Sequence, residues 1–160
     1  CALPIFECRE CEGTGFNKNL KKYKIKGKSI FDVWKMTLDE AIDFFEDIDK
    51  SITKVCITAS EIMLGHLQIG QATATLSGGE NIRIKIMKAS KSTAKVIGVD
   101  EPFKGLSNIE IDAVANYLNR IREKGKTLIV IDHSTGVEDY FSQWIQIENI
   151  DNRLIGKQFK

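Results

Sequence analysis

Residues 94–102 read Ala-Lys-Val-Ile-Gly-Val-Asp-Glu-Pro, a short apolar run that leads directly into two adjacent carboxylates. The apolar part predicts a β-strand over residues 94–99. Ser107 and Glu110 then have the spacing of a capping box, and the apolar positions after them predict a helix. Thr127–Ile131 is a second, continuous apolar run, which predicts a strand buried on both faces. A strand, a helix and a strand at this spacing predict an α/β fold with a parallel sheet, flanking helices and right-handed crossovers.

Shorter patterns surround this unit. Thr37 and Glu40 form another capping box, which precedes an amphipathic helix with an acidic outer face. Residues 22–26 alternate lysine with Tyr23 and Ile25, which predicts a strand with one lysine face. That face is either a solvated edge strand or a surface that meets phosphates. The other predicted elements are helices over residues 81–88 and 137–141 and strands over residues 144–147 and 153–155.

Composition narrows the class of protein. The chain has 160 residues, of which 42% are hydrophobic and 28% charged, and these values exclude bulk disorder. No run approaches the roughly 18 apolar residues of a membrane span, so we expect no membrane partner. The balance of 23 basic and 22 acidic residues excludes a simple basic tail. The low cysteine content indicates a reducing, cytoplasmic setting, and a first residue other than Met suggests a piece cut from a longer chain.

Polar side chains follow both strands of the predicted sheet. Asp100 and Glu101 end the first strand, and Asp132 with His133 ends the second. Because the carboxyl ends of parallel strands share one edge, we expect these groups to meet there. The first carboxylate can hold Mg²⁺, and the second can orient or deprotonate an attacking water. A turn cap is the structural alternative for Asp-Glu-Pro, and a structural role is the alternative for the histidine.

The stretch Leu76-Ser77-Gly78-Gly79-Glu80 precedes the helix predicted over residues 81–88. Two glycines allow a close backbone approach, the helix N-terminus offers unpaired amides, and the serine adds a hydroxyl donor. These features predict a phosphate-facing surface. A Ser-Gly-Gly turn before a helix is also a common structural device.

A complete phosphate-binding P-loop is not found in the sequence. Gly27-Lys28-Ser29 looks like the end of G-x-x-x-x-G-K-[ST], but Lys22 stands where the first glycine belongs. The residues between alternate like a strand, and no apolar strand precedes them. We therefore expect this chain to lack a complete nucleotide-binding site.

Cys8 and Cys11 form a C-x-x-C motif. A zinc ion needs four ligands, so the pair is at most half of a zinc site. A reduced pair near a turn is the alternative.

These motifs together resemble the second half of an ABC-type ATPase domain. Leu76 to Glu80 matches its signature motif, and Val96 to Glu101 matches its Walker B strand with the catalytic glutamate. Lys104 to Ser107 stands where the D-loop belongs, and His133 is placed like the switch histidine. In that family, the resemblance implies, two ATPase domains sandwich two ATP molecules, and each signature motif caps a phosphate held by the other domain's P-loop.

The upstream residues are similar to the UvrA family, whose members recognise damaged DNA. The similarity rests on four stretches and on Phe44-Phe45. The stretches are Cys8-Arg-Glu-Cys11-Glu-Gly13-Thr-Gly15-Phe16, Tyr23 to Lys28, Met36 to Ala41, and Leu64 to Glu80, which includes Gly70-Gln71 before the signature. It covers about residues 3–145. Asp132, Phe103-Lys104 and Gln68 depart from the usual residues of the family, which suggests a divergent UvrA-like paralogue.

The resemblance implies roles for individual residues. Asp100 would hold Mg²⁺, Glu101 would activate water, and His133 would contact the γ-phosphate. ATP bound by a P-loop elsewhere would be engaged by Ser77, Gly78, Gly79, Glu80 and Gln71. Cys8 and Cys11 would bind zinc together with a second cysteine pair.

The resemblance also implies an organisation and a function. Residues 1–30 would form a small zinc-motif and β-hairpin appendage, and residues 31–160 the C-terminal part of an ABC ATPase domain without Walker A. The complete protein would be an ATP-hydrolysing, DNA-binding protein of nucleotide excision repair, whereas this fragment alone would be inactive. Its partners would be DNA, the rest of the polypeptide with Walker A, a second ATPase domain, a second copy and a downstream excision-repair subunit. The alternatives are an ABC-type ATPase with a non-DNA target, such as a resistance or translocation factor, and a non-hydrolytic interaction module.

Overall fold

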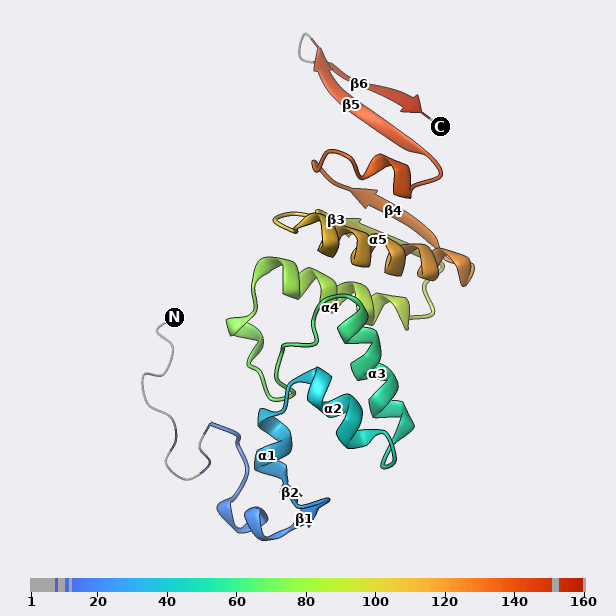
Figure 1. The fold of residues 1–160 in the computed structure, drawn as a ribbon. Coiled ribbons are helices and arrows are strands. Elements are labelled where there is room, and N and C mark those ends of the chain that lie inside the picture. The colour runs from blue at the N-terminus through green and yellow to red at the C-terminus, as the bar shows by residue number, and fades with distance from the viewer. Residues whose placement is uncertain (1–7, 9–10, 12, 151–152, 160) are drawn as a thin grey trace. The chain divides into compact units, whose positions relative to one another are not determined.

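The computed structural model describes residue 8, residue 11, residues 13–150 and residues 153–159. The chain forms two compact units, Cys1–Asn81 and Ile82–Lys160. Figure 1 shows the elements of each unit with their labels. Cys1, which prompted the expectation of a longer chain, lies outside the described residues, and the predicted boundary at residue 30 stays a prediction.

The lysine-rich segment forms a short β-hairpin. Strand β1 (Lys24–Ile25) pairs antiparallel with β2 (Lys28–Ser29). Lys26 and Gly27 connect them with φ values of +48° and +78°. Two successive residues with positive φ form the tight turn that suits the twist of a hairpin. The strand predicted over residues 22–26 is therefore wrong in extent, because the turn interrupts the alternation and a 3₁₀ helix, η1 (Lys18–Lys22), precedes it.

Side-chain caps begin the three helices of the first unit. Ser29 and Asp32 cap each other reciprocally at the start of the helix that begins at Ile30. Asp49 caps the helix that begins at Lys50, because its side chain accepts from two backbone N–H groups. Thr37 and Glu40 form the predicted capping box, with N–H to side-chain oxygen distances of 2.9 and 3.1 Å. The acidic helix is confirmed, although it ends at Phe45. The helices are α1 (Ile30–Lys35), α2 (Leu38–Phe45) and α3 (Lys50–Glu61).

The loop after α3 is tied to the segment between α1 and α2. Four backbone hydrogen bonds of 2.8–3.0 Å join residues 65–70 to residues 34–39. The loop side chains Leu64 and Leu67 are buried, and α2 packs against α3. This loop is therefore a rigid part of the first unit.

Helix α4 (Gly78–Ser90) follows a single 3₁₀ turn, η2 (Thr73–Thr75). It begins before the predicted start at residue 81. Gly78 and Gly79 are consequently inside its first turn, which corrects the expectation that they precede the helix. The physical reason is the cap formed by Ser77 and Glu80, described below.

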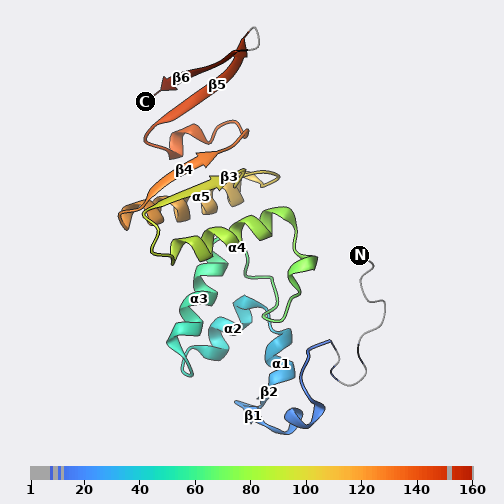
Figure 2. The same ribbon diagram turned by 180° about the vertical axis from the view of Figure 1, so that it is seen from behind.

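The second unit contains the predicted parallel strands. Strand β3 (Val96–Asp100) pairs parallel with β4 (Thr127–Ile131), and Asp100 is in register with Ile131. Helix α5 (Asn108–Glu123) connects the two strands. Helix α5 lies along one face of this pair, as Figures 1 and 2 show from opposite sides. The core between them is built from Ile97, Val99, Val114, Leu118 and Ile121.

The opposite face of the pair is exposed within the described part of the chain. Val96, Ile129 and Ile131 are 56%, 56% and 58% exposed. The prediction that β4 is buried on both faces is therefore wrong here. A continuous apolar run suits two covered faces, but coverage of the second face depends on other segments.

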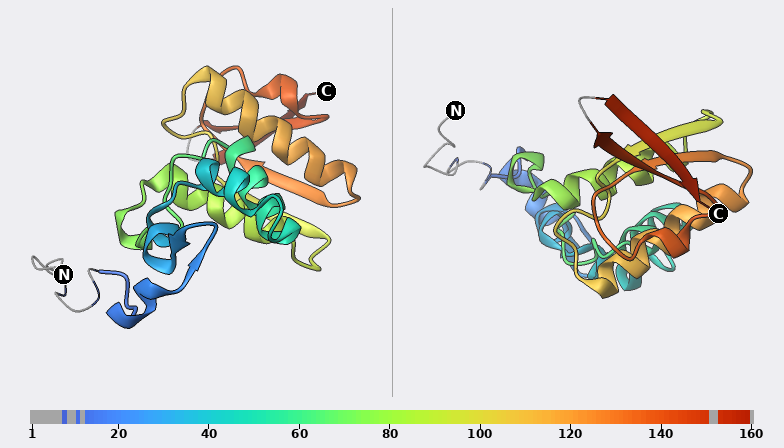
Figure 3. Two further views of the ribbon diagram at one scale, coloured as in Figure 1. Left: turned by 60° about the horizontal axis from the view of Figure 1, so that its bottom comes forward. Right: turned by 90° about the horizontal axis from the view of Figure 1, so that it is seen from above.

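The C-terminal residues form a second hairpin. Strand β5 (Trp144–Ile150) pairs antiparallel with β6 (Arg153–Phe159), which confirms both predicted strands and extends them (Figure 3). The rings of Trp144 and Phe159 stack at 4.3 Å. The helix predicted over residues 137–141 is a single 3₁₀ turn, η3 (Glu138–Tyr140). No helix among the described residues is long and apolar enough to cross a membrane.

Candidate functional site

The carboxyl end of β3 carries the two predicted acidic residues. Asp100 is the last residue of the strand and is exposed, whereas Glu101 is half-buried. The backbone N–H of Glu101 donates to the carbonyl oxygen of Ile131 at 2.7 Å, which places Glu101 beside the end of β4. Its φ of +49° is a left-handed conformation that is uncommon for a residue other than glycine. The backbone therefore holds Glu101 in a defined place at the sheet edge.

Lys104 forms an ion pair with this glutamate. Its Nζ donates to Glu101 Oε2 at 2.6 Å, and the two side chains are 71% and 32% exposed. The hydrogen bond to Glu101, and then the charge of that residue, raise the pKa of Lys104, and the charges of Asp100 and Asp132 add to the effect. Lys104 is therefore a cation beside a cluster of carboxylates at neutral pH.

Asp132 connects the loops that follow the two strands. Its Oδ2 accepts from the N–H of Phe103 at 3.0 Å, and its Oδ1 accepts from the N–H of Ser134 at 2.7 Å. Partial burial acts to raise the pKa of Asp132, but the hydrogen bonds from Ser134 and Phe103 together outweigh it and keep the pKa below its usual value. Asp132 is thus an ionised acceptor that ties the two loops together. His133, which follows directly, is exposed.

A cavity of about 390 Å³ adjoins the same edge. Asp100 and Glu101 line it together with Gly98 of β3 and with Lys85 and apolar side chains of α4. Two carboxylates beside an open volume can position a cation and activate a water molecule. The second unit thus brings together the predicted acids of both strand ends.

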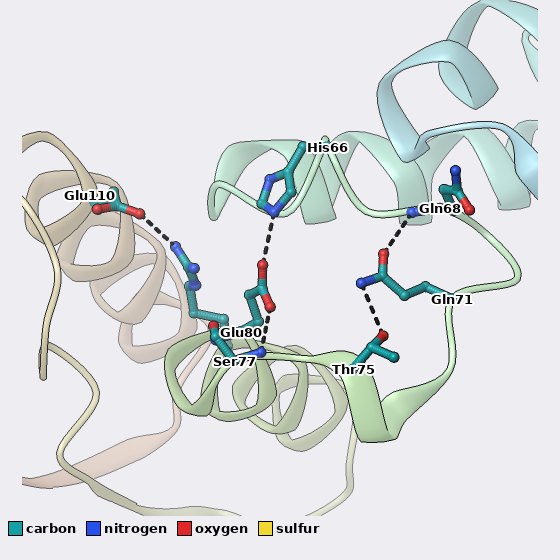
Figure 4. Close-up of polar contacts among 8 residues, drawn as sticks. His66, Gln68, Gln71, Thr75, Ser77, Glu80 and Glu110 are labelled. Atoms are coloured by element: carbon teal, nitrogen blue, oxygen red, sulfur yellow. Dashed lines mark hydrogen bonds and ion pairs between the residues drawn. The ribbon is translucent and has the colours of Figure 1, made fainter. Parts of the chain in front are cut away.

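Ser77 and Glu80 cap the start of α4 reciprocally (Figure 4). The N–H of Ser77 donates to Glu80 Oε2 at 2.6 Å, and the N–H of Glu80 donates to Ser77 Oγ at 3.2 Å. The Ser77 hydroxyl also hydrogen-bonds the Glu80 carboxylate, so the whole serine takes part in the cap. The first N–H groups of a helix have no intrahelical partner, so Gly78 and Gly79 present backbone donors beside this hydroxyl. Such a turn can hold an anion such as phosphate.

Gln71 braces the segment that leads to this turn. Its Oε1 accepts from the N–H of Gln68 at 3.2 Å, and its Nε2 donates to Thr75 Oγ1 at 3.3 Å, as Figure 4 shows. A cavity of about 430 Å³ lies beside it, with Trp34 and Thr14 in its lining. In the first unit, Gln71 and the Ser-Gly-Gly turn therefore lie on one segment, residues 71–79, that side-chain hydrogen bonds hold in place.

Arg83 and Glu110 join α4 to α5 within the second unit. Arg83 Nη1 donates to Glu110 Oε1 at 3.3 Å, and the side chains are 5% and 29% exposed. Glu110 also forms the predicted capping box with Ser107, whose N–H and hydroxyl both donate to its Oε2 at 2.9 Å. The hydrogen bonds from Ser107, followed by the contact with Arg83, keep the pKa of Glu110 below its usual value.

Cys8 is exposed and Cys11 is half-buried. The N–H and the hydroxyl of Thr14 both donate to the carbonyl oxygen of Cys11, at 3.0 and 2.5 Å, so a tight turn follows the motif. Among the residues that the structure describes, no group of three or more His, Cys, Asp or Glu could hold a metal ion. The pair by itself supplies two of the four ligands that zinc requires.

Proteins of known family resemble this chain over most of its length. A UvrABC system protein A from Rickettsia bellii is 39% identical over 134 residues, which are 82% of this chain and 14% of that protein. A UvrABC system protein A from Staphylococcus epidermidis is 39% identical over 133 residues, or 81% of this chain and 14% of that protein. The crystal structure of UvrA2 from Deinococcus radiodurans, 31% identical, matches 94% of this chain and 19% of its own with a TM-score of 0.81.

The chain belongs to the UvrA family. It corresponds to a C-terminal portion of UvrA and spans 14% of the length of the curated UvrA relatives named above. An archaeal ribosome recycling factor, aABCE1, in complex with the stalk protein aP1, shares the fold with a TM-score of 0.55 and 23% identity over 79% of this chain and 23% of its own. No family model matches the chain.

Among the described residues near the candidate site of this UvrA-like chain, three side-chain ion pairs were not predicted. They are Lys104 with Glu101, Arg83 with Glu110, and His66 with Glu80. The first is an i,i+3 pair, whose spacing is a usable local signal. The other two pairs are separated by 27 and 14 positions in the sequence, so no local pattern predicts them.

Proposed function

We propose that this chain carries the signature, Walker B, D-loop and switch-histidine elements of an ATP-hydrolysing, DNA-binding UvrA-type protein of excision repair. The observation that carries the proposal is the parallel β3–β4 edge. There, Asp100 and Glu101 end one strand, and Asp132 with His133 ends its neighbour. Chemistry in open α/β sheets takes place at this edge.

The residues take these roles in the proposed reaction. Glu101, fixed by its backbone contact to Ile131, accepts a proton from the attacking water. His133 contacts the γ-phosphate, and Asp132 holds the loop from which it projects. Ser77, which directly precedes α4, and Gly78 and Gly79 in its first turn donate to the phosphates of an ATP held by the P-loop of another ATPase domain, with Glu80 and Gln71 as supports.

The chain offers a donor that fits Mg²⁺ but not a complete nucleotide site. Mg²⁺ prefers oxygen ligands, and the exposed carboxylate of Asp100 at the strand end is of that kind. When bound, the ion supplies positive charge that offsets the charge of the phosphates. A P-loop on another part of the polypeptide would hold most of the nucleotide, because Gly27 and Lys28 here belong to the turn and second strand of the β1–β2 hairpin.

DNA, a second ATPase domain, a second copy and a downstream excision-repair subunit are the proposed partners, and the cytoplasm is the proposed location. Residues 1–30 would be a module distinct from the ATPase portion. Its hairpin exposes Lys24 and Lys28 together with Tyr23, whose side chain can stack on a base. This lysine surface is a second place where DNA would bind.

The function is tested by comparing this 160-residue chain with a longer protein that contains it and a P-loop. We expect negligible ATP hydrolysis by the chain and clear hydrolysis by the longer protein. The longer protein should bind damaged duplex more tightly than intact duplex, with a steep salt dependence, because phosphate contacts release counterions.

Three outcomes would contradict this function. Robust turnover by the chain itself would show that its nucleotide site is complete. Binding to DNA that is weak, indifferent to damage and insensitive to salt would favour an ATPase with another target. A longer protein without a P-loop would favour a non-hydrolytic module.

We also propose that Cys8 and Cys11 are half of a zinc site, completed by two ligands from outside the described residues. A tight turn, closed by hydrogen bonds from Thr14 to the carbonyl oxygen of Cys11, follows the motif. The spacing of the two cysteines is that of structural zinc motifs.

Zinc content tests this site directly. In the longer protein we expect about one zinc per chain at this motif, lost when Cys8→Ser and Cys11→Ser are combined, because two thiolates cannot retain the ion alone. Cys56→Ala is the matched control, since Cys56 is a buried residue of α3 and is not part of the C-x-x-C motif. Unchanged zinc in the double variant would remove the motif as a ligand pair.

A further inference from the structure

The carboxylate of Glu80 is shared between two donors from different parts of the first unit. Its Oε2 accepts from the N–H of Ser77 at 2.6 Å, and its Oε1 lies 2.8 Å from His66 Nε2 (Figure 4). The Glu80 side chain is only 15% exposed, whereas that of His66 is 63% exposed. An ionised carboxylate only accepts hydrogen bonds, so this arrangement gives each of its oxygens a donor.

The imidazole comes from a rigid part of the unit. His66 lies between Gly65, whose carbonyl oxygen accepts from Asp39 at 3.0 Å, and Leu67, whose carbonyl oxygen accepts from Leu38 at 2.8 Å. Leu67 is also buried. The backbone on both sides of His66 is thus held against the start of α2, so the ring reaches Glu80 from a fixed backbone position.

Glu80 in turn determines the geometry of the phosphate-facing turn. The N–H of Ser77, and next the contact with His66, keep the pKa of Glu80 below its usual value. The carboxylate is therefore ionised at neutral pH and holds the Ser77 residue in the cap, while the N–H groups of Gly78 and Gly79 belong to the first helical turn and have no intrahelical partner.

We infer that His66 is a positioning residue for the Ser77–Gly79 turn, acting through Glu80 so that the turn is pre-organised to receive phosphate. The functional half of this inference rests on the proposed role of the turn in ATP binding. Pre-organisation matters because donors that are already fixed need no reordering when the anion arrives. The loop before the signature thereby becomes part of the nucleotide site without touching the nucleotide.

Two variants separate the contact from the packing of the ring. His66→Leu removes the donor to Glu80, and His66→Gln keeps an N–H donor at a similar reach. Gln68→Leu is the control in the same loop, since Gln68 contacts Gln71 through its backbone N–H. In the 160-residue chain, NMR would give the pKa of Glu80 and the amide exchange rate of Ser77.

We expect His66→Leu to raise the pKa of Glu80 toward its usual value and to speed exchange at Ser77 by about fivefold, the effect of one lost hydrogen bond. His66→Gln should restore most of both quantities, and Gln68→Leu should change neither. A Leu variant with wild-type values for Glu80 and Ser77 overturns the inference, whatever its enzymatic behaviour.

The P-loop-bearing protein provides the second readout. There, His66→Leu should raise KM for ATP more than it lowers kcat, and His66→Gln should restore KM. Equal KM values for the wild type and the Leu variant would overturn the link to nucleotide binding. If the Leu variant exchanges its Ser77 amide faster but the wild-type longer protein does not hydrolyse ATP, the positioning role of His66 would stand and the proposed function would be rejected.

Discussion

Replacing Glu101 by Gln in the P-loop-bearing protein should lower kcat for ATP hydrolysis by about 10²–10⁴-fold, the usual contribution of a general base. The amide has nearly the same shape as the carboxylate, and its oxygen can still accept from Lys104 Nζ, which lies 2.6 Å from Glu101 Oε2. The amide cannot take up a proton from water. ATP should therefore remain bound while turnover stops.

Pre-steady-state and equilibrium measurements distinguish this loss from a binding defect. The Kd for ATP, read by a fluorescent analogue, should stay close to the wild-type value, and the burst of phosphate release should disappear. Lys104→Gln is the matched control, because it removes the ion pair and leaves the carboxylate in place. Normal kcat in the Glu101 variant would remove this residue as the base.

Glu110→Ala should clearly lower the stability of the second unit. The change removes the partner of Arg83, whose side chain is 5% exposed, and also the acceptor that caps α5 through Ser107. Arg83 Nε already lacks a hydrogen-bond partner in the described structure, so the guanidinium has few other contacts to replace the lost one. Leaving a buried charge without its partner costs about 3 kcal/mol.

Urea unfolding and amide exchange at the centre of α5 would measure this loss. Glu123→Ala is the control, because Glu123 is exposed at the other end of the same helix and its removal should change stability little. Equal stability of the Glu110 variant and the wild type would show that the buried pair contributes nothing.

The difference between wild type and the Glu110 variant should depend on pH in one direction. The folded-state pKa of Glu110 lies below its usual value of 4.5, because Ser107 and Arg83 favour the carboxylate. A carboxyl group with a lowered folded pKa contributes stability above its unfolded pKa and loses it as pH falls through the folded value. The advantage of the wild type should therefore be full at neutral pH and decline below pH 4.5.

Local patterns predicted the parts of the site that lie close together in the sequence. The capping boxes at Thr37 and Ser107 depend on residues three positions apart, and the strand that ends in Asp100 and Glu101 is a single apolar run. The parallel pairing of β3 and β4 followed from the length of the helical connection. Such features require only backbone geometry and nearest neighbours.

Other parts of the site could not be found in this way. The cap formed by Ser77 and Glu80 has the same spacing as the other capping boxes. Because glycine weakens a helix, the two glycines between them led to a predicted start at residue 81, whereas α4 begins at Gly78. The anchor of Glu80 on His66 depends on how the loop after α3 folds back, and the apolar alternation of residues 22–26 competed with a turn at Lys26 and Gly27.

The sequence by itself determined α2, α5, the strands from β3 to β6 and the acids at the end of β3, because hydrophobic period, capping pairs and motif spacing are local properties. Tertiary structure alone decided that one face of the β3–β4 pair is covered by α5 while Ile129 and Ile131 on the other are exposed. It also decided that Arg83 meets Glu110 and that His66 meets Glu80. The residues next to a side chain in the sequence indicate which kinds of partner it can bind and whether it can be buried. The partner that it contacts depends on how distant segments of the chain pack.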